Sequence, residues 1–191
     1  MKYQSVELVR VVEREYVPWS NGAGLTAPIA VGDVVGGLPQ WRVSVARLGS
    51  VPSEFSTFRG TDRIFTVVGR YGVEFDWGSS MTKVDPWQPF SFDGALNPWC
   101  VPEGETSAFN VMTDPSRACG SVVMRRPGDG DWMTDPAAVT VVLVRDGQVC
   151  VDTRCAAAGD CVVVRHAAVR ISGTASVLVA VIRASVSSRL Q

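Results

Sequence analysis

The same order of short strands occurs twice along this chain, and this repetition restricts its possible folds more than any other feature. In the first half, residues 63–68 and 73–77 flank a glycine-bearing turn, and apolar strand-like segments follow at 89–92 and 107–112. In the second half, residues 140–144 and 148–151 flank a similar turn, and segments 159–164 and 176–182 follow. The identities differ but the order agrees, so we expect a duplicated β unit.

Helix signals are scarce, whereas residues 41–48 alternate with the period of two that is typical of a strand. Two sets of short antiparallel strands predict an all-β fold of two small barrels or jelly rolls packed together. We expect a first domain over 1–118 and a second, degenerate one over 119–191, with residues 124–136 as a linking loop. The short turns after residues 68 and 144 each predict a hairpin.

Composition excludes several classes of protein. Apolar residues make up 46% and charged residues 19% of the 191 positions, which is typical of a globular chain. The net charge of −1 and the lack of charge runs argue against nucleic acid or an anionic membrane as a partner. The first 16 residues lack the apolar stretch of a signal peptide, and no apolar run reaches the length of a membrane span. We expect a cytoplasmic protein.

Cysteine and histidine usage bears on redox state and metal binding. The five cysteines are odd in number, and no two have the C-x-x-C spacing of redox or zinc motifs. We therefore expect free thiols in a reducing compartment, with Cys150, Cys155 and Cys161 buried on valine-rich strands. His166 is the only histidine, and one imidazole cannot supply the usual ligand set of a transition metal. We expect neither a metal nor another cofactor.

Residues 18–26 read PWSNGAGLT, and their glycines resemble a nucleotide-binding loop at first sight. A dinucleotide fingerprint needs a buried strand before the glycines and a helix after them. Here the preceding residues are charged and end at Pro18, Pro28 follows closely, and no Lys-Ser or Lys-Thr follows the glycines. The segment is interpreted as a tight loop in which glycine permits positive φ.

The difference between the two repeats predicts a ligand site in the first. Ala108, Asn110 and Met112 share one strand face, whereas the corresponding positions of the second repeat hold three valines, Val177, Val179 and Val181. The second repeat has lost polar character where the first keeps it. An amide that is merely buried and satisfied by backbone explains Asn110 equally well.

Four motifs in order carry a family resemblance: P-W-x-N-G-x-G-x-T from 18, W-R-x-S-x-A from 41, F-S-x-F-x-G-x-D-R from 55, and F-N-V-M from 109. Over residues 5–125 the chain resembles the HutD/Ves family of small bicupin proteins. The resemblance implies an all-β bicupin fold and a role as sensor or governor of histidine utilisation, with N-formyl-L-glutamate as the proposed ligand. The chain departs from the family pattern at Ser20, Ala23, Pro28 and Ala108, where the family has lysine, glycine, an acidic residue and aspartate.

Arg63 is the leading candidate to bind a carboxylate, because a guanidinium offers two parallel donors and Arg63 shares a strand face with Phe65 and Val67. An ion pair with a carboxylate on another strand is an equal alternative. Arg42 is the second candidate for the anion. The full set of candidate ligand-binding residues is Trp19, Asn21, Arg42, Ser44, Arg63, Asn110 and Met112.

No catalytic residue can be assigned, because the chain has no Gly-x-Ser-x-Gly elbow for its only histidine to serve. A non-catalytic protein that binds or senses a small carboxylate metabolite is therefore favoured. A metal-independent cupin enzyme acting on a small polar acid is the alternative, and a homodimer is left open.

Overall fold

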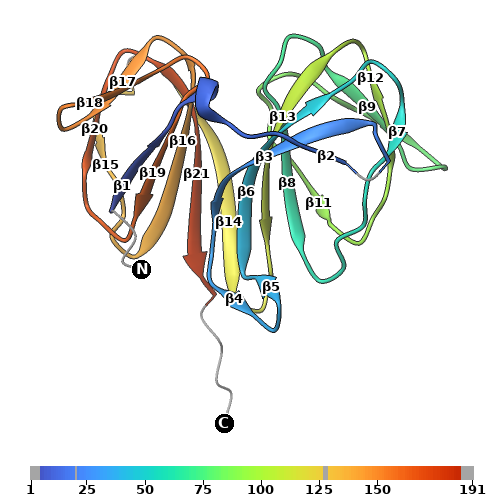
Figure 1. The fold of residues 1–191 in the computed structure, drawn as a ribbon, viewed down its shortest axis with the longest axis horizontal. Coiled ribbons are helices and arrows are strands. Elements are labelled where there is room, and N and C mark those ends of the chain that lie inside the picture. The colour runs from blue at the N-terminus through green and yellow to red at the C-terminus, as the bar shows by residue number, and fades with distance from the viewer. Residues whose placement is uncertain (1–4, 20, 127–128, 186–191) are drawn as a thin grey trace. The chain divides into compact units, whose positions relative to one another are not determined.

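The computed structural model describes residues 5–19, 21–126 and 129–185, and these residues form strands, turns and one short 3-10 helix (Figure 1). They fall into two compact units. The first unit is Glu15–Ala118. The second unit comprises the described parts of Met1–Arg14 and Cys119–Gln191.

The first unit consists of two main antiparallel sheets with an aromatic core. Phe55, Phe65 and Phe75 lie with ring centroids 5.1–5.5 Å apart in edge-to-face contacts, which aromatic quadrupoles favour. The six-stranded sheet has the order β11 (Phe90–Asp93), β8 (Asp62–Val67), β13 (Thr106–Thr113), β6 (Trp41–Leu48), β3 (Gly24–Val31) and β2 (Val17–Pro18). The four-stranded sheet has the order β10 (Met81–Val84), β9 (Val73–Asp76), β12 (Trp99–Pro102) and β7 (Ser53–Glu54). A small ribbon of β4 (Val34–Val35) and β5 (Leu38–Pro39) completes this unit.

The second unit also has two sheets, around a core that is rich in valine. Its five-stranded sheet has the order β1 (Val6–Val9), β19 (Cys161–Arg165), β16 (Ala138–Asp146), β21 (Ser176–Ala184) and β14 (Ala118–Arg125). Its four-stranded sheet has the order β15 (Trp132–Met133), β20 (Arg170–Gly173), β17 (Gln148–Val151) and β18 (Arg154–Ala157). The segment expected as a linking loop thus contains the end of β14 and all of β15.

The two units repeat one topology, as the sequence predicted. The order β11-β8-β13-β6 of the first unit corresponds to β19-β16-β21-β14 of the second. The order β10-β9-β12-β7 corresponds in the same way to β18-β17-β20-β15. Each strand from β6 to β13 therefore has its counterpart eight strands later, and the all-β expectation is confirmed.

The two predicted hairpins are wrong. β8 and β9 follow one another but belong to different sheets, and β16 and β17 do the same. Phe65 of β8 and Phe75 of β9 pack against each other across the core, at a centroid distance of 5.1 Å. Two strands that bury their apolar faces against each other stack as facing layers, and cannot pair edge to edge. Strand periodicity and turn length do not distinguish these two arrangements.

The N-terminal segment lies with the second unit, which differs from the expected first domain of 1–118. β1 pairs antiparallel with β19, from Val6 opposite Val164 to Val9 opposite Cys161. The 3-10 helix η1 (Val11–Glu13) follows β1. The physical reason is that the exposed edge of β19 offers β1 a ladder of hydrogen bonds.

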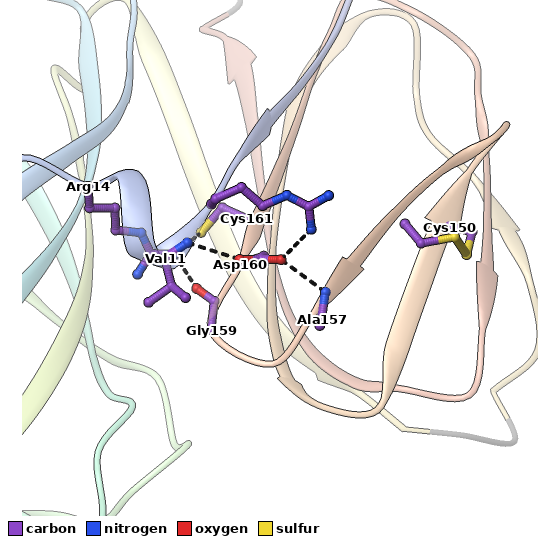
Figure 2. Close-up of polar contacts among 9 residues, drawn as sticks. Val11, Arg14, Cys150, Ala157, Gly159, Asp160 and Cys161 are labelled. Carbon is purple, nitrogen blue, oxygen red and sulfur yellow. Dashed lines mark hydrogen bonds and ion pairs between the residues drawn. A yellow bond between two sulfur atoms is a disulfide. The ribbon is translucent and has the colours of Figure 1, made fainter.

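Asp160 anchors this segment (Figure 2). Its buried carboxylate accepts hydrogen bonds from Arg10 Nη1 at 2.8 Å and from the backbone nitrogens of Val11 and Ala157 at 2.9 and 3.1 Å. Arg14 Nη2 donates to the carbonyl of Gly159 and lies 3.2 Å from Cys161 Sγ. Burial raises the pKa of the Cys161 thiol to about 12, so it remains neutral.

The expectation of free thiols is wrong at two positions. Cys150 and Cys155 form a disulfide between β17 and β18, where they lie directly opposite each other. Cys100 and Cys161 are free and buried, and Cys119 is free and exposed. The spacing of five residues did not reveal the disulfide, because a cross-strand pair depends on the hairpin register rather than on a short cysteine motif.

Replacing Cys155 by serine should lower the free energy of unfolding by about 2 kcal/mol, the loop-entropy value for so short a cross-linked loop. Urea denaturation with and without a reductant measures this effect. Cys119→Ser is the matched control, because Cys119 is an exposed free thiol. Five reactive thiols in the denatured, unreduced protein would contradict the disulfide.

Candidate ligand-binding site

A cavity of about 350 Å³ lies in the first unit, on one face of its six-stranded sheet. Six of the seven candidate residues line it: Trp19, Arg42, Ser44, Arg63, Asn110 and Met112. The remaining lining residues are Val17, Pro18, Thr26, Pro28, Ala46, Phe55, Ser56 and Phe58.

Strand register brings the polar members of this set together. β13 runs between β6 and β8, so Ser44 lies opposite Asn110, and Met112 lies opposite both Arg42 and Arg63. Alternate residues of a strand point to the same face. Arg42 and Ser44 therefore project to the same side of the sheet as Asn110 and Met112.

Arg63 is the most buried charge in the cavity, at 6% exposure. Its Nε and Nη2 both donate to Asn110 Oδ1, at 3.1 and 2.9 Å. Its guanidinium carbon lies 4.4 Å from the ring centroid of Phe55 and 5.4 Å from that of Phe92. Among the described residues no carboxylate pairs with Arg63, so the structural ion pair considered from the sequence is not found. Its partner is a neutral amide.

Two cations share this cavity. Burial, together with the nearby charge of Arg42, lowers the pKa of Arg63 to about 9. Burial also lowers the pKa of Arg42, whose guanidinium carbon lies 5.4 Å from the ring centroid of Phe58 and whose Nη2 lies 3.6 Å from Met112 Sδ. None of the described residues that line the cavity is acidic. The local charge is therefore positive and uncompensated.

The PWSNGAGLT segment begins at the end of β2 and ends within β3, and its Trp19 lines the cavity. Trp19 Nε1 donates to Thr26 Oγ1 at 2.6 Å, and its ring meets Phe55 edge-on at 6.2 Å. A Cβ at Gly24 would lie 2.7 Å from the carbonyl of Arg47 and 3.1 Å from the Trp19 ring, so only glycine fits there. Gly22 has a φ of +69°, which glycine adopts without strain.

Asn21 lies outside this cavity and lines a neighbouring one that shares Phe55 and Ser56 with it, so its role as a candidate ligand-binding residue stays a prediction. It is exposed, its Oδ1 accepts from the nitrogen of Ala23 at 3.1 Å, and its Nδ2 donates to the carbonyl of Glu54 at 3.4 Å. An asparagine that bonds to backbone two residues ahead stabilises a turn. The sequence indicated a role for Asn21 in the loop but gave no means of telling which way it faces.

Sequence reasoning missed the aromatic wall of the cavity. Phe55, Ser56 and Phe58 belong to the motif that begins at residue 55, and this was the available signal for them. Among the departures from the family pattern, Pro28 lines the cavity, whereas Ala108 is fully buried in the core. Ser20 lies outside the described residues.

The corresponding part of the second unit holds no charged side chain at the positions of Arg63 and Asn110. Asn110 pairs with Phe65 and Met112 with Arg63, just as Val179 pairs with Val142 and Val181 with Thr140. Thr140 and Val179 thus occupy the positions of Arg63 and Asn110. Val142 and Val179 belong to a buried apolar cluster. Both members of the arginine–asparagine pair are replaced together in this unit.

Duplicated two-sheet barrels of this kind define the bicupin class. A Cupin 2 conserved barrel domain protein from Leptotrichia buccalis superposes with a TM-score of 0.56 at 11% identity, over 85% of this chain and 89% of that one. At such low identity the likeness concerns the fold alone.

The particular family follows from the sequence. The family model HutD matches residues 12–184, and the chain belongs to the HutD family. HutD from Pseudomonas fluorescens SBW25, in a structure from a formate condition, has 25% identity and a TM-score of 0.81, covering 95% of this chain and 100% of that one. A conserved protein of unknown function from Pseudomonas aeruginosa PAO1 has 25% identity and a TM-score of 0.78, covering 96% and 100%.

A Pseudomonas putida relative connects the family with hut genes by its name, an uncharacterised 21.2 kDa protein in the hutC 3′ region. It is 32% identical over 117 residues, which are 59% of this chain and 60% of the relative. The chain thus spans less than two thirds of that relative.

In the described parts of the chain, no helix is long and apolar enough to cross a membrane. Within the same residues, no group of three or more histidine, cysteine, aspartate or glutamate side chains is placed to hold a metal ion. The expectations of a metal-free, cytoplasmic protein stay predictions.

Proposed function

We propose that the first unit binds a small carboxylate metabolite, and that the protein senses this metabolite in histidine utilisation without catalysing a reaction. The observation that carries the proposal is the pair of guanidinium groups of Arg42 and Arg63 in a cavity whose described lining is free of acidic side chains. A cation that is buried without a counter-charge is costly, and a bound carboxylate supplies that charge.

The hydrogen-bonding groups of the cavity also favour an acceptor-rich ligand. A guanidinium can only donate, so the oxygen of Asn110 faces Arg63 and its Nδ2 is left to donate elsewhere. Arg42, Arg63 and Asn110 therefore all offer donors, and Ser44 and Ser56 add hydroxyl groups. Trp19, Phe55 and Phe58 provide apolar surface for a short methylene chain.

N-formyl-L-glutamate is the candidate ligand. It has two carboxylates for two arginines, a formyl oxygen for the amide of Asn110 and two methylenes for the aromatic wall. The cavity of about 350 Å³ is within the range of small-ligand sites, roughly 300–1,000 Å³. Membership of the HutD family and the hutC-region relative support the connection to histidine utilisation.

Binding is favoured over turnover by the chemistry of the lining. The described lining residues include no aspartate, glutamate, histidine, lysine or cysteine that could transfer a proton. Cys100, buried near Arg63, has its pKa raised to about 12 by burial and is a neutral thiol. A metal-independent cupin enzyme is the alternative that the following test separates.

N-formyl-L-glutamate should raise the melting temperature in proportion to the logarithm of its concentration, because it binds only the folded protein. At a hundredfold excess over Kd the stabilisation is about 2.7 kcal/mol. The control is N-formyl-L-glutaminamide, in which neutral amides replace both carboxylates and which should produce no comparable shift. The same melting-temperature measurement with other acids of histidine breakdown forms a screen of candidate ligands.

Two results would overturn the proposal. Failure of every acid in the screen to stabilise the protein at millimolar concentration would remove the carboxylate site. Steady consumption of the acid by purified protein, followed by NMR, would instead establish the enzyme.

A further inference from the structure

We infer that Asn110 determines the anion selectivity of the cavity, because it orients Arg63 without neutralising its charge. This inference rests on the proposed function, since it concerns the same site. It assigns Asn110 a role as a positioning residue for Arg63, which differs from that of a side chain that merely contacts the ligand.

The side chains of Asn110 and Arg63 project from two neighbouring strands of the six-stranded sheet. Asn110 on β13 and Arg63 on the adjacent β8 are diagonal neighbours, because Asn110 pairs with Phe65 and Met112 pairs with Arg63. Both side chains are nearly buried, at 3% and 6% exposure. One oxygen, Asn110 Oδ1, accepts from both Nε and Nη2, which fixes the plane of the guanidinium against the Phe55 ring.

The neutrality of this acceptor is the important property. A carboxylate in the place of the amide would hold Arg63 in the same plane with stronger, charge-assisted hydrogen bonds. It would also cancel the charge of Arg63, and an incoming anion would then face a neutral pair. An apolar side chain would leave the charge but not the orientation. Of these three side chains, only the amide both orients Arg63 and leaves its charge free to attract an anion.

A second observation supports this role. The corresponding positions in the second unit are Thr140 and Val179, so the cation and its neutral acceptor are absent together there. If Asn110 served only to fill the core, its amide could persist in the second unit without the arginine. If the arginine and the asparagine function as a pair, both are expected to be replaced together, as they are in the second unit.

Asn110→Asp is the decisive variant, and isothermal titration with N-formyl-L-glutamate and N-formyl-L-glutaminamide is the measurement. The variant should fold and bind the acid about 30-fold more weakly or worse, whereas the diamide should lose only the neutral hydrogen bond from Asn110 to its formyl oxygen, a loss of roughly fivefold. The preference for acid over diamide should therefore fall. Gln88→Glu, which adds the same charge at an exposed position of the same unit, should keep the wild-type preference.

Asn110→Leu tests the orienting role and does not depend on the folding of the aspartate variant. It should keep the preference for the acid but bind it about tenfold more weakly, because the guanidinium loses its acceptor. Wild-type acid affinity in Asn110→Leu, or an undiminished acid preference in Asn110→Asp, would overturn this inference and leave the proposed function intact. A wild-type protein that does not prefer the acid over the diamide would overturn both.

Discussion

Replacing Arg63 by methionine should weaken the binding of N-formyl-L-glutamate by about 2–4 kcal/mol, the usual effect of truncating one partner of a buried charged pair. Methionine keeps an unbranched chain against Phe55 but removes the donors. Isothermal titration measures the change. Arg59→Met removes the same charge from an exposed position of the same unit and is the matched control.

The stability of this variant separates two roles for Arg63. Its hydrogen-bond acceptor is Asn110, and no ion pair involving it is found among the described residues. We therefore expect the free energy of unfolding to change by less than about 1.5 kcal/mol, since a buried cation without a counter-charge is lost and packing is largely kept. Tight acid binding by folded Arg63→Met would exclude Arg63 from the site. Severe unfolding would make Arg63 a structural residue.

Replacing Asp160 by alanine should lower the stability of the second unit by about 3 kcal/mol. The substitution leaves the backbone nitrogens of Val11 and Ala157 and the side chain of Arg10 without their acceptor. The side chain of Arg10 is 40% exposed, so solvent screens the ion pair and the backbone donors account for most of the loss. Hydrogen exchange of the amides of β1 and β19 measures it locally, with exposed Glu7→Ala as the control.

This contribution should depend on pH. Burial by itself raises the pKa of Asp160, but the donors of Val11, Arg10 and Ala157 outweigh it and the net pKa is lowered. The folded state therefore holds the carboxylate ionised more strongly than the unfolded state does, where its pKa is about 3.9. The stabilisation is complete above that value and is lost as the pH falls through the folded pKa. An equal difference between the wild type and Asp160→Ala at pH 7 and at acidic pH would contradict this.

The sequence alone determined the all-β fold class, and it predicted the half of the duplication that holds the candidate site. Alternation of side chains is a local property, since residues i and i+2 of any strand share a face. For this reason the same order of strands could be recognised in both halves of the sequence. Alternation also assigned Arg42 and Ser44 to one face of their strand, and Asn110 and Met112 to one face of theirs. The contrast between Asn110 and Val179 likewise needed only an alignment of the two halves.

Only the tertiary structure decided which segments meet. Arg10 and Asp160 are 150 residues apart, so nothing local to the N-terminal segment placed it beside β19. Pairing across a sheet also decided that β8 and β9 face each other, that Cys150 lies opposite Cys155, and that Arg63 has Asn110 as its acceptor. These contacts depend on long-range register and on the burial of facing apolar surfaces, which strand periodicity does not encode. The sequence therefore supplied the chemical groups of the site, and the packing of the first unit determined which of them share one cavity.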